Sequence, residues 1–185
     1  MAKKNTYKVQ FRRRLEGKTN YKKRLALLKS GLHRLVVRRT NKYVKAQVIG
    51  YDPKGDRTIV DVTSKQLEKL GWKAGTKSLP SAYLTGLLAG TKAKEAKVEK
   101  AILDIGFAIP KRKGWWGAAL KGAIDSGLEI EAGEEALPSE ERIMGKHIEE
   151  YSKTGAKGNM FSKVGQQASL SKTFEEVKQK ILKAS

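Results

Sequence analysis

The fold of this 185-residue chain is decided by one stretch, Arg34-Leu35-Val36-Val37-Arg38-Arg39-Thr40-Asn41-Lys42-Tyr43-Val44-Lys45-Ala46-Gln47-Val48-Ile49. Leu35 and Val37 alternate with Arg34, Val36 and Arg38, and a period of two is typical of a strand with one buried face. Residues 40–42 supply a turn, after which Val44 and Val48 continue the alternation. The stretch therefore predicts two antiparallel strands with one apolar face and one charged face.

The sequence after this hairpin extends the prediction to a mixed α/β fold. Residues 52–56 carry a strong turn signal, and the alternation of Val60 and Val62 indicates a third strand. Ala101–Ile109 is apolar enough for a strand buried on both faces, as expected when a helical crossover adds a parallel strand. We therefore predict a three-stranded antiparallel meander extended by a parallel strand, with helices packed on the sheet.

Capping residues and apolar periodicity predict the helices, and Thr19 or Asn20 is expected to cap the first of them. An apolar stripe on this first helix should face the body of the protein, and its cationic side should face a ligand. The last helix carries a capping box from Thr173 to Glu176. A loop rich in Gly and Lys is expected from Lys153 to Gly165. The apolar stripe of this last helix consists of Phe174, Val177 and Ile181. The other expected helices are one that ends at Gly31, a short one at residues 64–70, one that begins at Pro80 and runs through Leu88, and two at residues 116–126 and 139–151.

Positive charge is concentrated at the N-terminus of the chain. Sixteen of its 39 Lys and Arg residues lie in residues 1–45, where Glu16 is the one acid, whereas residues 46–145 hold 15 bases and 14 acids. Self-repulsion in so short a stretch opposes compaction unless counter-charge arrives from outside. Residues 1–18 show no period and are expected to be extended and disordered until they meet a partner. The phosphates of a nucleic acid fit that partner, because contact with them releases condensed counterions.

Other classes of site are disfavoured by composition and spacing. The chain has no cysteine and two histidines, His33 and His147, so neither a disulfide nor a metal cluster is expected. Residues 71–78 approach a phosphate-binding loop, but Thr76 replaces the required second glycine, so we expect no cofactor and no small-molecule substrate. Without a signal-type segment or an apolar run of about 18 residues, we expect a soluble, cytoplasmic protein with no membrane partner.

Four blocks in order resemble a known family: Phe11–Tyr21, Arg34–Ile49, Asp104–Gly106 and Ala118–Leu128. They closely resemble the archaeal-type 5S-rRNA-binding protein of the large ribosomal subunit, the universal family numbered eighteen, whose eukaryotic member is numbered five. The resemblance covers residues 5–150 and extends into the tail. It implies a mixed α/β domain that attaches 5S rRNA to the central protuberance and touches both 5S and 23S rRNA.

The resemblance also implies which residues face RNA. They belong to the basic arm, to the first helix, to the first strand with its turn, and to the basic stretch before the last core helix. The family's bacterial branch has a Tyr-His-Gly-Arg block at the position of residues 114–117, which are Gly-Trp-Trp-Gly here. On this chain the implied RNA-binding residues are Arg12, Arg13, Arg14, Lys18, Tyr21, Lys22, Arg24, Arg34, Arg38, Arg39, Asn41, Lys42, Lys111, Arg112 and Lys113.

The charge pattern and the resemblance together divide the chain into three parts. Residues 1–18 form the basic RNA-binding arm, and residues 19–128 form the mixed α/β rRNA-binding core. Residues 129–185 combine an acidic linker, marked by six Glu within residues 129–141, with a helical and basic C-terminal extension. We expect neighbouring large-subunit proteins as further partners.

Three functions are compatible with the basic N-terminal part. We expect a non-catalytic structural protein of the large ribosomal subunit. One alternative is an RNA-processing or modifying enzyme that uses the arm for substrate affinity, and another is a general nucleic-acid compaction protein. The enzyme would need a convergent catalytic set, and the Glu134-Glu135 and Glu140-Glu141 pairs are better explained as a solvated linker.

Overall fold

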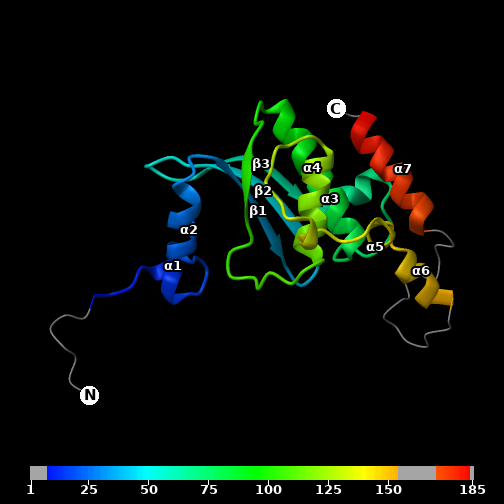
Figure 1. Ribbon diagram of the computed structural model, residues 1–185, viewed down its shortest axis with the longest axis horizontal. Coiled ribbons are helices and arrows are strands. Elements are labelled where there is room, and N and C mark those ends of the chain that lie inside the picture. The colour runs from blue at the N-terminus through cyan, green and yellow to red at the C-terminus, as the bar shows by residue number, and fades with distance from the viewer. Residues whose placement is uncertain (1–7, 154–169, 184–185) are drawn as a thin grey trace, which may run out of the picture.

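A four-stranded mixed sheet lies at the centre of the computed structural model, which describes residues 8–153 and 170–183 (Figure 1). The sheet has the order β3-β2-β1-β4, with β1 antiparallel to β2, β2 antiparallel to β3, and β1 parallel to β4. The predicted meander with an added parallel strand is confirmed. The strands are β1 (His33–Arg39), β2 (Val44–Gly50), β3 (Arg57–Thr63) and β4 (Ala101–Asp104).

Helices lie on both sides of this sheet. The long helices α3 and α4 cover one face, α7 packs on α3, and the short helices α1 and α2 lie on the opposite side (Figure 1). The helical elements are α1 (Arg12–Leu15), α2 (Tyr21–Leu28), η1 (Ser64–Leu70), α3 (Leu79–Glu95), α4 (Trp115–Asp125), η2 (Glu134–Ala136), α5 (Glu140–Met144), α6 (Lys146–Lys153) and α7 (Leu170–Lys183).

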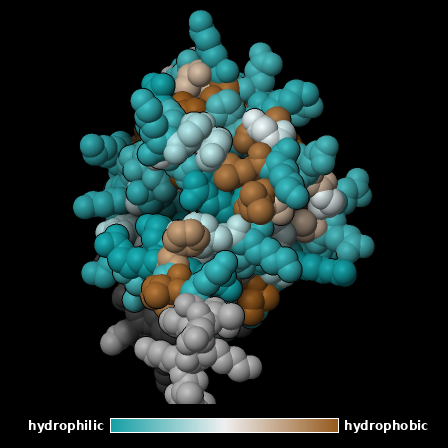
Figure 2. Space-filling model, turned by 90° about the vertical axis from the view of Figure 1, so that its left-hand side faces the viewer, coloured by the Kyte–Doolittle hydropathy of each residue, from teal (hydrophilic) through white to brown (hydrophobic). Residues whose placement is uncertain are grey.

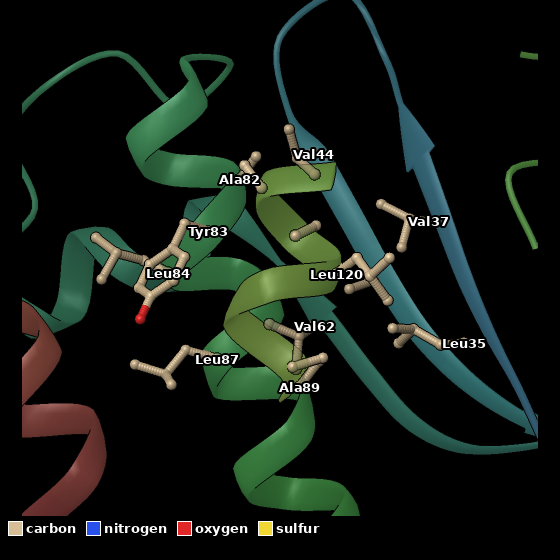
Figure 3. Packing of buried hydrophobic residues seen from close by; sticks show 14 of the residues in the cluster. Leu35, Val37, Val44, Val62, Ala82, Tyr83, Leu84, Leu87, Ala89 and Leu120 are labelled. Atoms are coloured by element: carbon tan, nitrogen blue, oxygen red, sulfur yellow. The ribbon is translucent and has the colours of Figure 1, made fainter. Parts of the chain in front are cut away.

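The hydrophobic core fills the space between the sheet and helices α3 and α4. Leu35 and Val37 of β1 point toward Leu120 of α4, as Figure 3 shows, and the side chains of both strand residues are completely buried. Fully burying such a side chain contributes about 1.5–3 kcal/mol to folding. The period-two alternation of β1 therefore sends Leu35 and Val37 to the core and leaves Arg34, Val36 and Arg38 on the other face.

Helices α3 and α4 approach each other so closely that their backbones touch through glycines. A Cβ atom at Gly86 of α3 would collide with the carbonyl of Ala119, and one at Gly122 of α4 would collide with the carbonyl of Tyr83. Glycine inside a helix costs about 1 kcal/mol relative to alanine. Glycine is present at both positions despite this cost, because a larger residue would force the two helices apart.

The predicted strand at residues 101–109 is wrong in its second half. Strand β4 ends at Asp104, whose Oδ1 accepts a hydrogen bond of 2.8 Å from the backbone N–H of Gly106. Gly106 has a φ of +62°, a left-handed conformation that turns the chain out of the sheet. Phe107 and Ile109 are consequently 49% and 79% exposed instead of buried.

Two expectations about the N-terminal part need correction. The arm is not extended throughout, because residues 12–15 form one helical turn in which the N–H of Leu15 donates to the carbonyl of Phe11. Asn20 caps α2 as predicted, with its Oδ1 accepting from the N–H of Lys23 at 3.1 Å. The apolar stripe of α2 does not reach the core, however: none of its residues is buried, and Leu25 is 60% exposed.

The C-terminal part also differs in its helix boundaries. The single helix predicted for residues 139–151 is divided into α5 and α6 by Gly145, whose φ of +85° favours glycine. Helix α7 begins at Leu170 instead of at the predicted capping box, and the N–H of Ser171 donates to Glu149 Oε1 at 2.7 Å. The predicted loop at residues 153–165 lies outside the described residues, apart from Lys153, which ends α6.

The apolar stripe predicted for the last helix is confirmed. Phe174, Val177 and Ile181 are buried in the same hydrophobic cluster as the sheet residues, together with Leu170. The described part of the C-terminal extension is thus docked on the core through α3. The division of the chain at residue 129 stays a prediction.

We predict that Gly122→Ala lowers the free energy of unfolding by about 1–3 kcal/mol, although alanine is the better helix former, because the new methyl group meets the α3 backbone. Urea denaturation measures this change. Gly133→Ala is the matched control, because its φ is −72° and a Cβ there meets nothing within 4 Å. Unfolding of Gly122→Ala at the wild-type urea midpoint would contradict the close packing of α3 and α4.

Candidate nucleic-acid interface

The predicted RNA-binding residues come from the arm, α2, β1 with its turn, and the loop before α4, and all of them except Tyr21 and Asn41 are cations. Figure 2 views the molecule from the side of α1 and α2 and shows a largely hydrophilic surface with scattered apolar side chains. The arm and α2 contribute Arg12, Arg13, Arg14, Lys18, Tyr21, Lys22 and Arg24. Strand β1, its turn and the loop before α4 contribute Arg34, Arg38, Arg39, Asn41, Lys42, Lys111, Arg112 and Lys113.

Part of this set converges on one shallow hollow. The cationic hollow has a volume of about 430 Å³ and combines residues of the arm, of the end of β1 and of the start of α4. Four cations line it without an acidic residue among the lining side chains. The complete lining is Arg13, Gly17, Lys18, Arg38, Arg39, Ile105, Phe107, Ala108 and Trp115.

Local contacts fix two of the arginines at this hollow. The guanidinium of Arg39 lies 5.7 Å from the ring centroid of Trp115, within the range of a cation–π interaction. The guanidinium of Arg38 lies so close to Gly106 that a Cβ there would overlap it, and its Nη1 is 3.4 Å from the carbonyl oxygen of Ile105. Gly106 therefore ends β4 and also makes room for Arg38.

Arg34 has a different environment from the other predicted site residues. It is 4% exposed, with Nη2 donating to Asp56 Oδ2 at 2.6 Å and Nη1 donating to Asp104 Oδ2 at 3.1 Å. Arg24 of α2 donates from Nη2 to the other oxygen of Asp56 at 2.8 Å. These four residues, which we call the Arg34 network, connect α2 to the loop before β3 and to the end of β4.

The Arg34 network changes the interpretation of two predicted RNA contacts. The burial of Arg34 leaves its guanidinium without a surface that a phosphate can reach. The guanidinium of Arg24 is also engaged by Asp56, and its side chain is 28% exposed. Both arginines therefore position α2 on the sheet, and neither belongs to the exposed cationic surface.

The remaining predicted residues extend beyond the cationic hollow. Arg112 forms an ion pair of 3.1 Å with Glu135, but both side chains are more than three-quarters exposed, so water screens this pair strongly. Lys111, Lys113, Asn41 and Lys42 are exposed as well. None of these five lines the cationic hollow, so the structure does not bring them together with Arg13 and Lys18.

Sequence reasoning missed two exposed aromatic residues, Phe11 and Phe107. Phe11 is 70% exposed, and its ring centroid lies 5.2 Å from that of Tyr21. The apolar run at residues 101–109 predicts a buried strand that would include Phe107. The Asp-Ile-Gly sequence at residues 104–106 carries the missed signal, since an Asp two residues before a Gly can accept a backbone N–H and form a turn.

The described residues offer neither a metal site nor a membrane span. Residues 8–153 and 170–183 contain no group of three or more His, Asp or Glu side chains arranged to hold a metal ion. Among the helices of these residues, none has the length and apolar character needed to cross a bilayer.

Clustered cations on the surface of a mixed α/β domain are typical of proteins that bind polyanions. Residues 5–99 match the model of the family described as ribosomal large subunit proteins 60S L5 and 50S L18. The large ribosomal subunit protein uL18 of Korarchaeum cryptofilum (strain OPF8) is 55% identical over 152 residues, which cover 82% of this chain and 77% of that protein. The chain therefore belongs to this family of large-subunit ribosomal proteins.

Membership of the family sets the general function and location. The protein is a structural constituent of the large ribosomal subunit in the cytoplasm, and it is not an enzyme. Its partners are rRNA and other ribosomal proteins. The predicted family is confirmed, and the clustered surface cations agree with an RNA-bound protein.

We predict that Asp56→Asn lowers the free energy of unfolding by about 1–3 kcal/mol, because it removes the charge that Arg34 and Arg24 share. Chemical denaturation measures the loss. Asp61→Asn is the matched control: Asp61 pairs with Lys45 at 3.1 Å, but the two side chains are 49% and 37% exposed. We expect less than about 1 kcal/mol for that exposed pair. Equal effects of the two substitutions would show that the Arg34 network is no stronger than a surface ion pair.

Proposed function

We propose that the protein binds 5S rRNA and attaches it to 23S rRNA in the central protuberance of the large subunit. The observation that supports this most directly is the cationic hollow, in which the arm, the end of β1 and the start of α4 meet. The four sequence blocks that resemble 5S-rRNA-binding proteins supply most of these elements. Arg13 and Lys18 come from the first block, and Arg38 and Arg39 come from the second.

The chemistry of the hollow suits a folded RNA. The major groove of an A-form helix is too deep and narrow for side chains to read, so proteins grip the backbone, the 2′-hydroxyls and the unpaired nucleotides of structured RNA. The planar guanidinium of arginine matches two phosphate oxygens at once, whereas lysine acts as a point charge. Arg38 and Arg39 are held by contacts with the protein, so they lose little conformational freedom when they bind.

We assign direct RNA contact to the members of the predicted set outside the Arg34 network and a positioning role to Arg24 and Arg34. The exposed cations extend from the cationic hollow to the β1–β2 turn and to the loop before α4. This spread lets two RNA segments bind at once, as attachment of one rRNA to another requires. The proposed contact residues are Arg12, Arg13, Arg14, Lys18, Tyr21, Lys22, Arg38, Arg39, Asn41, Lys42, Lys111, Arg112 and Lys113.

A competition experiment tests the proposal. The full chain is bound to labelled 5S rRNA at near-physiological salt and challenged with unlabelled 5S rRNA or with duplex DNA of equal length. We expect duplex DNA to compete at least about 10³-fold less well, because binding by charge alone is weak at that salt concentration. Equal competition by both nucleic acids would overturn the proposal and favour general nucleic-acid compaction.

Replacing Arg12, Arg13 and Arg14 together by Ala should weaken binding to 5S rRNA and flatten its salt dependence. Each lost phosphate contact removes about 0.7–0.9 from the slope of log K against log salt, so we expect a reduction of about two to three units. Filter binding over a series of salt concentrations measures the slope. Replacement of the same three residues by Lys keeps the charge and should keep the slope. A wild-type slope in the alanine variant would remove the arm from the interface.

Arg38→Ala and Arg39→Ala should each lower the affinity for 5S rRNA while the protein still melts cooperatively near the wild-type temperature. Arg38 lies on the polar face of the sheet, and Arg39 is exposed at the end of β1 beside Trp115, so neither substitution removes an apolar side chain from the hydrophobic core. Binding is measured by filter retention and folding by circular dichroism. Wild-type affinity in both variants would exclude the cationic hollow as the RNA-binding site.

A further inference from the structure

Large apolar side chains are exposed beside the cations on this side of the protein. Phe11 and Phe107 are 70% and 49% exposed, and Tyr21 is half-buried. Apolar side chains appear among hydrophilic ones on this side of the molecule in Figure 2. Single exposed apolar residues are common on protein surfaces, but aromatic rings gathered at one place are informative about binding.

Two of these rings line a second hollow, next to the cationic one. The aromatic hollow has a volume of about 320 Å³. Phe107 is presented there by the turn at residues 104–106, and Tyr21 is supported from outside by the ring of Phe11 at 5.2 Å, inclined by 44°. The complete lining is Gln10, Arg14, Gly17, Thr19, Asn20, Tyr21, Lys22 and Phe107.

The charges of the aromatic hollow identify the kind of molecule that fits it. Arg14 and Lys22 are cations, and the lining residues include neither Asp nor Glu. An apolar segment of a protein would have to cover these two charges without compensating them, which is unfavourable. A nucleotide matches both features, because its base has a flat apolar face and its phosphate carries a negative charge.

We propose that the aromatic hollow binds one unpaired nucleobase of rRNA, stacked on Phe107 and Tyr21, with the flanking phosphates held by Arg14 and Lys22. The identity of the RNA rests on the proposed function, but the chemistry of the hollow does not. Gln10 offers an amide donor and an acceptor to the edge of the base. The side-chain oxygen of Asn20 caps α2, which leaves its amide nitrogen as a donor.

This site would discriminate between paired and unpaired nucleotides, which the cationic hollow does not do. Bases inside a double helix are stacked on their neighbours and cannot enter a hollow on a protein surface. A base in a loop or bulge can be turned out and stacked on an aromatic side chain. The two adjacent hollows therefore have different roles. The cationic hollow binds the phosphate backbone of the RNA, and the aromatic hollow binds where a base is unpaired.

The test compares three variants of the full chain in binding to 5S rRNA. Phe107→Leu keeps an apolar side chain but removes the aromatic face, and we expect an affinity about 5- to 150-fold lower. The slope of log K against log salt should stay at its wild-type value, because no phosphate contact is lost. Phe107→Tyr should retain the affinity. Ile109→Ala, a change at a residue 79% exposed in the same loop, should have no effect.

A second measurement separates this inference from the proposed function. A single-stranded oligoribonucleotide containing one 2-aminopurine is titrated with wild-type protein, and stacking on the aromatic hollow should quench its fluorescence. Phe107→Leu should abolish most of that quenching. Wild-type affinity and wild-type quenching in Phe107→Leu would overturn the inference. Loss of quenching without a preference for 5S rRNA over duplex DNA would instead overturn the proposed function and leave the base-binding site standing.

Discussion

The buried guanidinium of Arg34, held between Asp56 and Asp104, is the interaction on which the functional side of this protein depends. Helix α2 buries none of its own residues, so its place on the sheet relies on the charge that Arg24 shares with Arg34 through Asp56. Charges removed from water are costly unless their partners are in place, so the network acts as a unit. The segments that it joins carry the arm and the turn that presents Phe107.

The two faces of the central sheet have different roles, one in stability and the other in function. Its apolar face packs on α3 and α4, whose glycines let the two helices touch, and this side contains the hydrophobic core. Its other face is polar and carries the Arg34 network together with the cations at its edge. The RNA-facing side chains can therefore change without disturbing the core, whereas the network couples the position of α2 to the fold of the sheet.

The elements predicted correctly are those whose signals are local. The meander and α4 follow from periodicity and turn signals and lie close to their predicted positions, and the parallel strand begins where predicted. Of the two main errors, one has a local cause and the other a distant one. Phe107 lies in an apolar run, yet the hydrogen bond between Asp104 and Gly106 turns it outward. The stripe of α2 looked like a core face, yet ion pairs hold that helix.

The sequence by itself determined the mixed α/β fold, the basic N-terminal part and the family, because periodicity, charge and the order of the resembling blocks can be read along the chain. Only the tertiary structure decided which arginines are free. Arg34 and Arg38 occupy equivalent positions on one strand, but the partners of Arg34 lie 22 and 70 residues away in the chain. Folding places those carboxylates around Arg34 and leaves Arg38 at the edge of the cationic hollow. Because Coulomb attraction is strong only over a few ångströms, Arg34 is held by its carboxylates while Arg38 has no carboxylate partner among the described residues.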